Sequence, residues 1–133
     1  MLVPIPLGRR RLKSRGYNQS EWLARALGRR WRLPVVADLL ERTRDTASQT
    51  ALTPGARLAN VAGAFGVRNA DWRMQNATTA HSTFSSHHSA IVLVDDVFTT
   101  GATLAEAARA LELAGARAVS AVTFGRAVIP DFT

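Results

Sequence analysis

The chain has 133 residues, which is enough for one domain built around one hydrophobic core. Its hydrophobic content of 47% is that of an ordinary globular protein, and no apolar run reaches the roughly 20 residues that a membrane helix needs. Because the chain has no cysteine, disulfides and thiolate metal sites are excluded. No signal-peptide pattern follows Met1, so we expect a cytoplasmic protein that does not associate with membranes.

The net charge of +7 is concentrated in the first half of the chain. Residues 1–73 contain 14 of the 17 basic residues and five of the ten acidic ones, and every basic residue except Lys13 is an arginine. Arginine binds phosphate groups through paired hydrogen bonds, so a polyphosphate ligand and a nucleic acid both fit this distribution. An arginine-rich genome explains most of these residues equally well, because net charge alone does not define a site.

The first predicted element is a short strand over residues 2–6. Pro4 and Pro6 lack backbone donors, which is typical of an edge strand or of a strand end. A basic segment follows between Gly8 and Gly16, and we expect it to be a loop. Its five positive charges repel one another unless an anion lies close, although a solvated surface loop is an alternative. These charges belong to Arg9, Arg10, Arg11, Lys13 and Arg15.

A helix is predicted from Asn18 to about Trp31. Asn18 and Glu21 have the spacing of a capping box, and the helix is expected to stop before Pro34. Its apolar residues recur with the helical period, which favours a buried face over a surface platform that stacks nucleic-acid bases. They are Trp22, Leu23, Ala26, Leu27 and Trp31.

The middle of the chain is polar and weakly patterned. A short strand is expected at residues 35–36, a short helix from Pro54 to Val61, and a brief strand over residues 64–68. The polar segment over residues 40–60 has two interpretations, a lid that closes over a reacting centre or an unstructured linker. Residues 69–89 are rich in Ser, Thr and His and predict a mobile surface insertion. Its three histidines have no acidic or cysteine residue between or directly beside them and form an incomplete set of metal ligands.

One later stretch carries the strongest signal. Ile91 to Val94 form an apolar, β-branched run typical of a strand buried in a parallel sheet, and Asp95 and Asp96 follow it directly. Residues 99–103 predict a tight turn that opens a helix, where backbone amides and the helix dipole stabilise a phosphate group. Carboxylates beside such a turn suit ribose hydroxyls or a magnesium-bound sugar phosphate. A surface connection with ordinary capping threonines is the alternative.

The remaining residues predict a helix and a final buried strand. Gly115 is well placed to end the helix, and the strand is expected over residues 118–124. Strand, helix and strand with short connections form a βαβ unit, which predicts an α/β fold with a parallel sheet. The buried face of the helix is expected to contain Leu104, Ala107, Ala108, Leu111 and Ala114.

The stretch from Ile91 to Thr103 resembles the phosphoribosyl-pyrophosphate (PRPP) signature of type I phosphoribosyltransferases, with Phe98 where an aliphatic residue is commoner. Other blocks are similar to the ComF family of competence-associated phosphoribosyltransferase-like proteins. Together with the signature they follow the order of that family through most of residues 3–126, and the combination is far more specific than any single motif. The blocks lie at residues 3–7, 15–19, 42–52 and 57–65.

The resemblance implies a single domain over residues 1–133 with a small, Rossmann-like type I phosphoribosyltransferase fold that has a parallel sheet and no evident hood. It also implies that the cysteine-rich, zinc-binding N-terminal segment of the family is absent from this chain. The implied reaction transfers the phosphoribosyl group of PRPP to a nitrogen acceptor and releases pyrophosphate, with Mg²⁺ as cofactor. The sequence does not identify the acceptor.

The resemblance further implies roles for individual residues, with Asp95 and Asp96 reaching a metal only through PRPP-bound magnesium. PRPP binding is implied for Asp95, Asp96, Val97, Thr99, Thr100, Gly101, Ala102 and Thr103. Pyrophosphate binding is implied for Arg9, Arg10, Arg11, Lys13 and Arg15. The flexible catalytic loop of the family corresponds to the segment that carries Arg42, Arg44 and Arg57.

Two other functions fit the same residues. The first is an accessory role in DNA uptake, in which the basic surface binds single-stranded DNA and the partners are proteins of the competence machinery. The second is a PRPP sensor without catalysis. A homodimer is a further open alternative for the assembly.

Overall fold

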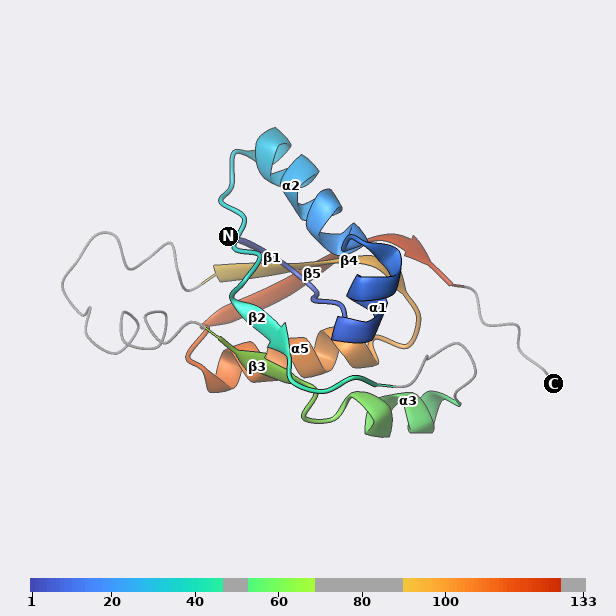
Figure 1. Ribbon diagram of the computed structural model, residues 1–133. Helices are drawn as coiled ribbons and strands as arrows, with labels where there is room; N and C mark the ends of the chain where they lie inside the picture. Colours follow the sequence, from blue (N-terminus) through green and yellow to red (C-terminus); the bar gives the residue numbers. More distant parts are fainter. Residues whose placement is uncertain (47–52, 69–89, 128–133) are drawn as a thin grey trace.

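The main sheet has three parallel strands with helices on both faces (Figure 1). In spatial order the strands are β1 (Leu2–Pro4), β4 (Ala90–Phe98) and β5 (Ala118–Arg126). The predicted α/β fold with a parallel sheet is therefore confirmed. The computed structural model describes residues 1–46, 53–68 and 90–127.

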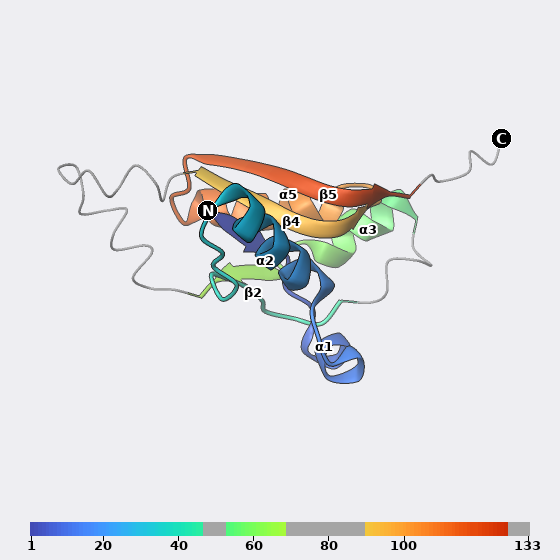
Figure 2. The same ribbon diagram turned by 90° about the horizontal axis from the view of Figure 1, so that it is seen from above.

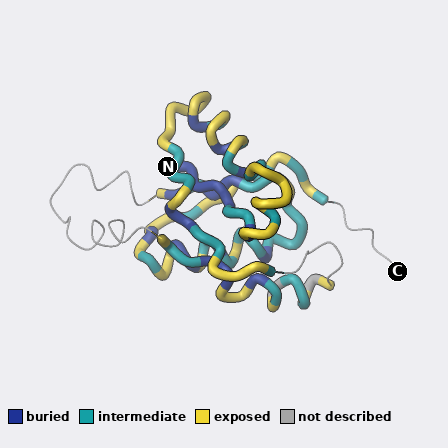
Figure 3. The backbone as a smooth tube through the Cα atoms, viewed as in Figure 1, coloured by how far each residue is buried: buried dark blue, intermediate teal, exposed yellow. Residues whose placement is uncertain are grey.

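Two helices sandwich the sheet. Helix α2 (Gln19–Trp31) lies over β1 and β4, and α5 (Ala102–Leu113) covers the opposite face (Figures 1 and 2). Because side chains alternate along a strand, Val3 and Leu93 pack into the larger core under α5, while Leu2 packs against α2. Figure 3 shows the buried residues gathered at the strands between the helices.

A second, antiparallel pair of strands lies beside α5. It is formed by β2 (Leu40–Arg42) and β3 (Phe65–Val67), and α3 (Pro54–Val61) precedes β3. The predicted short helix and the brief strand after it are thus confirmed. The proposed insertion at residues 69–89, with its three histidines, lies outside the described residues. Within the described part, no helix is long and apolar enough to cross a membrane.

Helix α2 has the predicted start and end, and its predicted buried face is observed only in part, since Leu23 and Leu27 are half-buried against the core. Asn18 caps it by accepting a hydrogen bond from the Ser20 backbone at 3.1 Å. Trp22 and Trp31, which we expected in the core, are 69% and 47% exposed. The buried stripe instead consists of Ser20, Ala24 and Gly28, because the helix lies so close to its neighbours that a Cβ at Gly28 would come within 2.6 Å of a Val35 methyl group. Large aromatic side chains do not fit at such a short separation.

The basic segment is a helix, so its prediction as a loop is wrong. Helix α1 (Arg9–Arg15) ends at Gly16, which adopts a left-handed conformation with φ of 80° and donates its N–H to the Leu12 carbonyl at 2.8 Å. Arginine, leucine and lysine are good helix formers, and their propensity here outweighs the repulsion between like charges.

Two strand predictions need correction. Strand β5 extends to Arg126 and is only half buried, with Phe124 54% exposed, because β5 is the edge strand of the described sheet and α2 lies over its neighbours. Residues 35–36 form no separate strand, and Val35 makes only an isolated parallel bridge to Leu2. That bridge covers the outer side of β1, which the two prolines had marked as an edge or a strand end.

Candidate functional site

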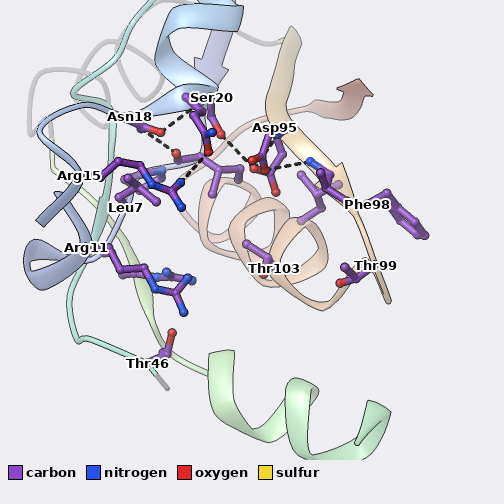
Figure 4. Close-up of a pocket in the computed structure, with 18 residues that line it drawn as sticks. Leu7, Arg11, Arg15, Asn18, Ser20, Thr46, Asp95, Phe98, Thr99 and Thr103 are labelled. Carbon is purple, nitrogen blue, oxygen red and sulfur yellow. Dashed lines mark hydrogen bonds between the residues drawn. The ribbon is translucent and has the colours of Figure 1, made fainter. Parts of the chain in front are cut away.

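A cavity of about 260 Å³ opens at the carboxyl ends of β1 and β4 (Figure 4). Ligands in open α/β sheets bind at this end of the strands, where the following loops meet. The cavity wall combines carboxylates, hydroxyls and arginines from segments that are distant in the sequence. It is lined by Ile5, Pro6, Leu7, Arg11, Arg15, Asn18, Gln19, Ser20, Arg42, Thr46, Asp95, Asp96, Val97, Phe98, Thr99, Gly101, Thr103 and Leu104.

The two carboxylates, Asp95 and Asp96, lie near the carboxyl end of β4 and line the cavity. Asp95 Oδ1 accepts hydrogen bonds from Ser20 Oγ at 2.9 Å and from the Asp96 backbone N–H at 3.0 Å. Asp96 Oδ1 accepts from the Val97 N–H at 2.8 Å. Burial raises the pKa of Asp95 to about 6, and the negative charge of Asp96 adds to the shift, while the hydrogen bonds from Ser20 and the Asp96 backbone oppose it. A ligand that donates hydrogen bonds to these carboxylates, or a cation that neutralises their charge, would therefore bind favourably in this part of the cavity.

The turn after β4 forms the second part of the wall. Gly101 adopts a φ of 79°, as its position in a tight turn requires, and its carbonyl accepts the first hydrogen bond of α5, from the Ala105 N–H at 2.9 Å. Thr99 and Thr103 line the cavity. Thr100 lies outside the wall, with its Oγ1 3.4 Å from the backbone nitrogen of Ala102, which is buried. The turn therefore presents hydroxyls and the start of a helix, an arrangement that favours an anion.

Three arginines form the opposite wall. Arg11 and Arg15 are four residues apart on α1, so both reach the cavity, and Figure 4 shows them across from Asp95. Arg42, at the end of β2, stacks its guanidinium 5.0 Å from the centre of the Phe65 ring. Its Nε is buried and has no hydrogen-bond partner. Burial, followed by the nearby charge of Arg11, lowers the pKa of Arg42, which indicates a cation whose surroundings in the folded protein do not fully compensate it.

The structure brings together only part of the predicted arginine set. Arg9, Arg10 and Lys13 are exposed on other sides of α1 and do not line the cavity, and Arg10 lies 3.8 Å from Asp45 instead. Arg44 and Arg57 also lie outside the wall, and Arg44 donates to the Ala62 carbonyl at 2.6 Å.

Sequence reasoning missed Ser20 as a site residue. Ser20 lies on the buried stripe that it forms with Ala24 and Gly28, and the periodicity of the apolar residues in α2 did not identify this stripe. Asn18 and Gln19, which also line the cavity, were visible only as part of a family-like block. The available signal for Ser20 was its spacing of four and eight residues from Ala24 and Gly28, which places three small residues on one side of the helix.

The donor set is compatible with magnesium carried by a ligand. Asp95 and Asp96 offer carboxylate oxygens, the ligand type that Mg²⁺ prefers. Among residues 1–46, 53–68 and 90–127, no group of three or more acidic, histidine or cysteine side chains forms a self-sufficient metal site. Magnesium often binds with one or two protein carboxylates while water and substrate phosphates supply the other ligands, and the pair fits this arrangement.

Comparison with known proteins identifies the family. A model of the phosphoribosyl transferase domain matches residues 14–127. The chain belongs to this family. The match includes the carboxylates, the threonine turn, Arg15 and Arg42, so the family assignment covers most of the cavity wall.

Curated relatives of this phosphoribosyl transferase domain are named for DNA utilization or for competence. DNA utilization protein YhgH of Escherichia coli K12 is 36% identical over 118 residues, which cover 89% of this chain and 45% of the relative. Competence protein F of Haemophilus influenzae is 30% identical over 126 residues, which cover 95% of this chain and 50% of the relative. The chain thus spans about half the length of the curated relatives it matches, and the prediction of a ComF-like phosphoribosyltransferase domain is confirmed. No solved structure matches the chain significantly.

Proposed function

We propose that this domain binds PRPP and transfers its phosphoribosyl group to a nitrogen acceptor. The observation that supports the proposal is the convergence, on one cavity, of paired carboxylates, a helix-opening threonine turn and three arginines. PRPP carries the three complementary groups, a vicinal diol, a 5′-phosphate and a pyrophosphate.

The sugar-phosphate end of the ligand is assigned to β4 and the turn that follows it. Asp95 and Asp96 accept hydrogen bonds from the ribose hydroxyls, since an ionised carboxylate offers only acceptors. The 5′-phosphate binds at the turn, where Thr99 and Thr103 donate from their hydroxyls and the first amides of α5 have no carbonyl partner within the helix. Positive φ at Gly101 brings the backbone close to the phosphate.

The pyrophosphate end is assigned to Arg11, Arg15 and Arg42. As the bond from the sugar C1 to the pyrophosphate oxygen breaks, positive charge develops on the sugar and negative charge on the leaving group. The three guanidinium groups stabilise that negative charge in a partly enclosed cavity. The acceptor nitrogen supplies the electron pair of the new C1–N bond and loses its proton to solvent. Asp95 and Asp96 would hold a magnesium ion that arrives with PRPP, and the ion would neutralise further charge on the leaving group.

Calorimetric titration with PRPP and magnesium tests the site. We expect saturable binding to the parent protein and none to the double variant Asp95→Asn with Asp96→Asn. A screen of nitrogenous bases for pyrophosphate release then tests catalysis. Binding without release for any acceptor would favour a PRPP sensor, and absence of binding by the folded parent would refute the site.

A second candidate function is binding of single-stranded DNA, and the exposed face of α2 supports it. The Tyr17 and Trp22 rings lie 5.5 Å apart at an angle of 46°, and both are exposed. The exposed Arg25 and Arg29 are on the same helix, with Arg25 paired to Glu21. Exposed aromatic rings beside cations are the usual platform for stacked bases. On this account the protein partners are components of the competence machinery, in keeping with the name of the Haemophilus influenzae relative.

The DNA-binding proposal is tested with a fluorescent oligothymidine at several salt concentrations. We expect affinity to fall steeply with salt, and Trp22→Ala to weaken binding about tenfold because one stacking contact is lost. Phe124→Ala is the matched control, since Phe124 is an exposed aromatic residue on β5. Equal effects of the two substitutions, or binding that does not respond to salt, would contradict a specific platform on α2.

A further inference from the structure

Ser20 is a buried hydroxyl in the wall of the cavity. Its relative exposure is 4%, and it is the one buried polar or charged residue of the described part of the chain. It lies in the first turn of α2, on the narrow stripe that packs against the sheet. A hydroxyl in such a place needs a hydrogen-bond partner inside the protein, because solvent cannot supply one.

The partner of Ser20 is the carboxylate of Asp95. Ser20 Oγ donates to Asp95 Oδ1 at 2.9 Å, and the Asp96 backbone N–H donates to the same oxygen at 3.0 Å. Both donors bind Oδ1, so together they restrain the orientation of the carboxylate. Neither of them uses Oδ2, which we therefore assign to a ligand.

Ser20 itself is held by a ring of hydrogen bonds that joins α2 to the sheet. The Asn18 side chain accepts from the Ser20 N–H at 3.1 Å and donates to the Ile5 carbonyl at 2.9 Å. The Ile5 N–H donates to the Val94 carbonyl at 2.9 Å, and Val94 directly precedes Asp95. The position of the Ser20 hydroxyl relative to Asp95 is therefore set by backbone and side-chain contacts on both sides.

We propose that Ser20 is a positioning residue for the ribose end of the ligand. It orients the Asp95 carboxylate so that Oδ2 accepts a hydrogen bond from one hydroxyl of a vicinal diol. The inference rests on the proposed function, since it assigns the diol of a ribose phosphate to Asp95. It adds a residue from outside the β4 stretch to the sugar-binding part of the site.

The test compares two ligands that share anionic charge but differ in the diol. Ribose 5-phosphate and inorganic pyrophosphate are titrated separately into the parent protein and into Ser20→Ala, Ser20→Thr and Ser14→Ala. Ser14 is an exposed serine on α1, so Ser14→Ala is the matched control for loss of a hydroxyl. Thermal melting without ligand shows whether each variant is folded.

We expect Ser20→Ala to lower the affinity for ribose 5-phosphate about tenfold, which is the scale of one hydrogen bond to a charged group. The affinity for pyrophosphate should stay unchanged. Ser20→Thr, which keeps the hydroxyl, should restore most of the ribose 5-phosphate affinity. Equal losses for both ligands, or no loss for ribose 5-phosphate, would overturn the role of Ser20 while leaving the proposed function intact. If the folded parent binds neither ligand, the proposed function itself is wrong and the inference falls with it.

Discussion

Replacing Arg42 with methionine should stabilise the ligand-free protein and lower its affinity for pyrophosphate. Arg42 Nε is buried without a hydrogen-bond partner, and burial together with the charge of Arg11 lowers the pKa of Arg42. The folded protein therefore keeps a cation that its surroundings do not fully compensate. Methionine has a similar length, packs against Phe65 and carries no charge.

The expected gain in stability follows from opposing terms at this position. Removing a buried unsatisfied donor recovers about 1–3 kcal/mol. Losing the contact between the guanidinium and the Phe65 ring costs about 0.5–2 kcal/mol. The attractions to Asp95 and Asp45 are lost as well, while the repulsion from Arg11 disappears. The net gain is about 1 kcal/mol, which corresponds to a rise in Tm of about 4 °C for a chain of this size.

The assay has two parts, thermal melting without ligand and calorimetric titration with pyrophosphate. Arg42→Met should raise the Tm and lower pyrophosphate affinity at least tenfold, because a charge-assisted contact contributes about 1.5–3 kcal/mol. Arg117→Met, which removes an exposed arginine between α5 and β5, is the control and should change neither quantity appreciably. A lower Tm combined with unchanged pyrophosphate affinity would refute the reasoning, since Arg42 would then be a structural residue.

Three further predictions concern β4 and its turn. The pKa of Asp95 is raised from 3.8 to about 6 in the folded state, so its contribution to stability is present below pH 4 and is lost as the pH rises to 6. The Tm without ligand should therefore fall between pH 4 and pH 6, and Asp95→Asn should remove this pH dependence of the Tm. We expect PRPP with magnesium to raise the Tm and Asp95→Asn with Asp96→Asn to abolish that rise, and a persisting rise in the double variant would place the diol elsewhere. Gly101→Ala should lower the Tm by about 4–8 °C and weaken the binding of ribose 5-phosphate. A side chain at a φ of 79° costs about 1–2 kcal/mol, and its Cβ would lie 3.0 Å from the Phe98 ring. An unchanged Tm would contradict the conformation of the turn.

The sequence predicted the part of the cavity that one continuous stretch builds. Residues 91–103 contain a strand, two carboxylates, a turn and a helix start, and each feature depends on contacts between near neighbours in the chain. Positive φ at Gly101 and the helix that begins at Ala102 are local properties of this kind. Local chemistry is therefore sufficient to locate the two carboxylates and the turn at which we propose that a phosphate binds.

The parts that sequence reasoning got wrong depend on packing between distant elements. Trp22 and Trp31 were expected inside because they are large and apolar, whereas the short separation between α2 and its neighbours leaves Ser20, Ala24 and Gly28 as its buried residues. That separation is a property of the assembled fold, and the hydrophobic pattern of the helix does not contain it. The Ser20–Asp95 hydrogen bond spans 75 residues and was missed for the same reason.

Helix α1 forms despite the repulsion that the sequence predicts among its five cations. That repulsion was expected unless an anion lies close, and the helix places like charges four residues apart, at Arg9 with Lys13 and at Arg11 with Arg15. A helix of seven residues gains little from its own hydrogen bonds, and Asp45 is the one carboxylate within 4 Å of these cations in the described residues. An anion held between Arg11 and Arg15 would turn one of the two repulsive pairs into two attractive contacts. The geometry that costs α1 stability without ligand is thus the geometry that favours a polyphosphate in the cavity, so order in α1 and occupancy of the site should be thermodynamically linked.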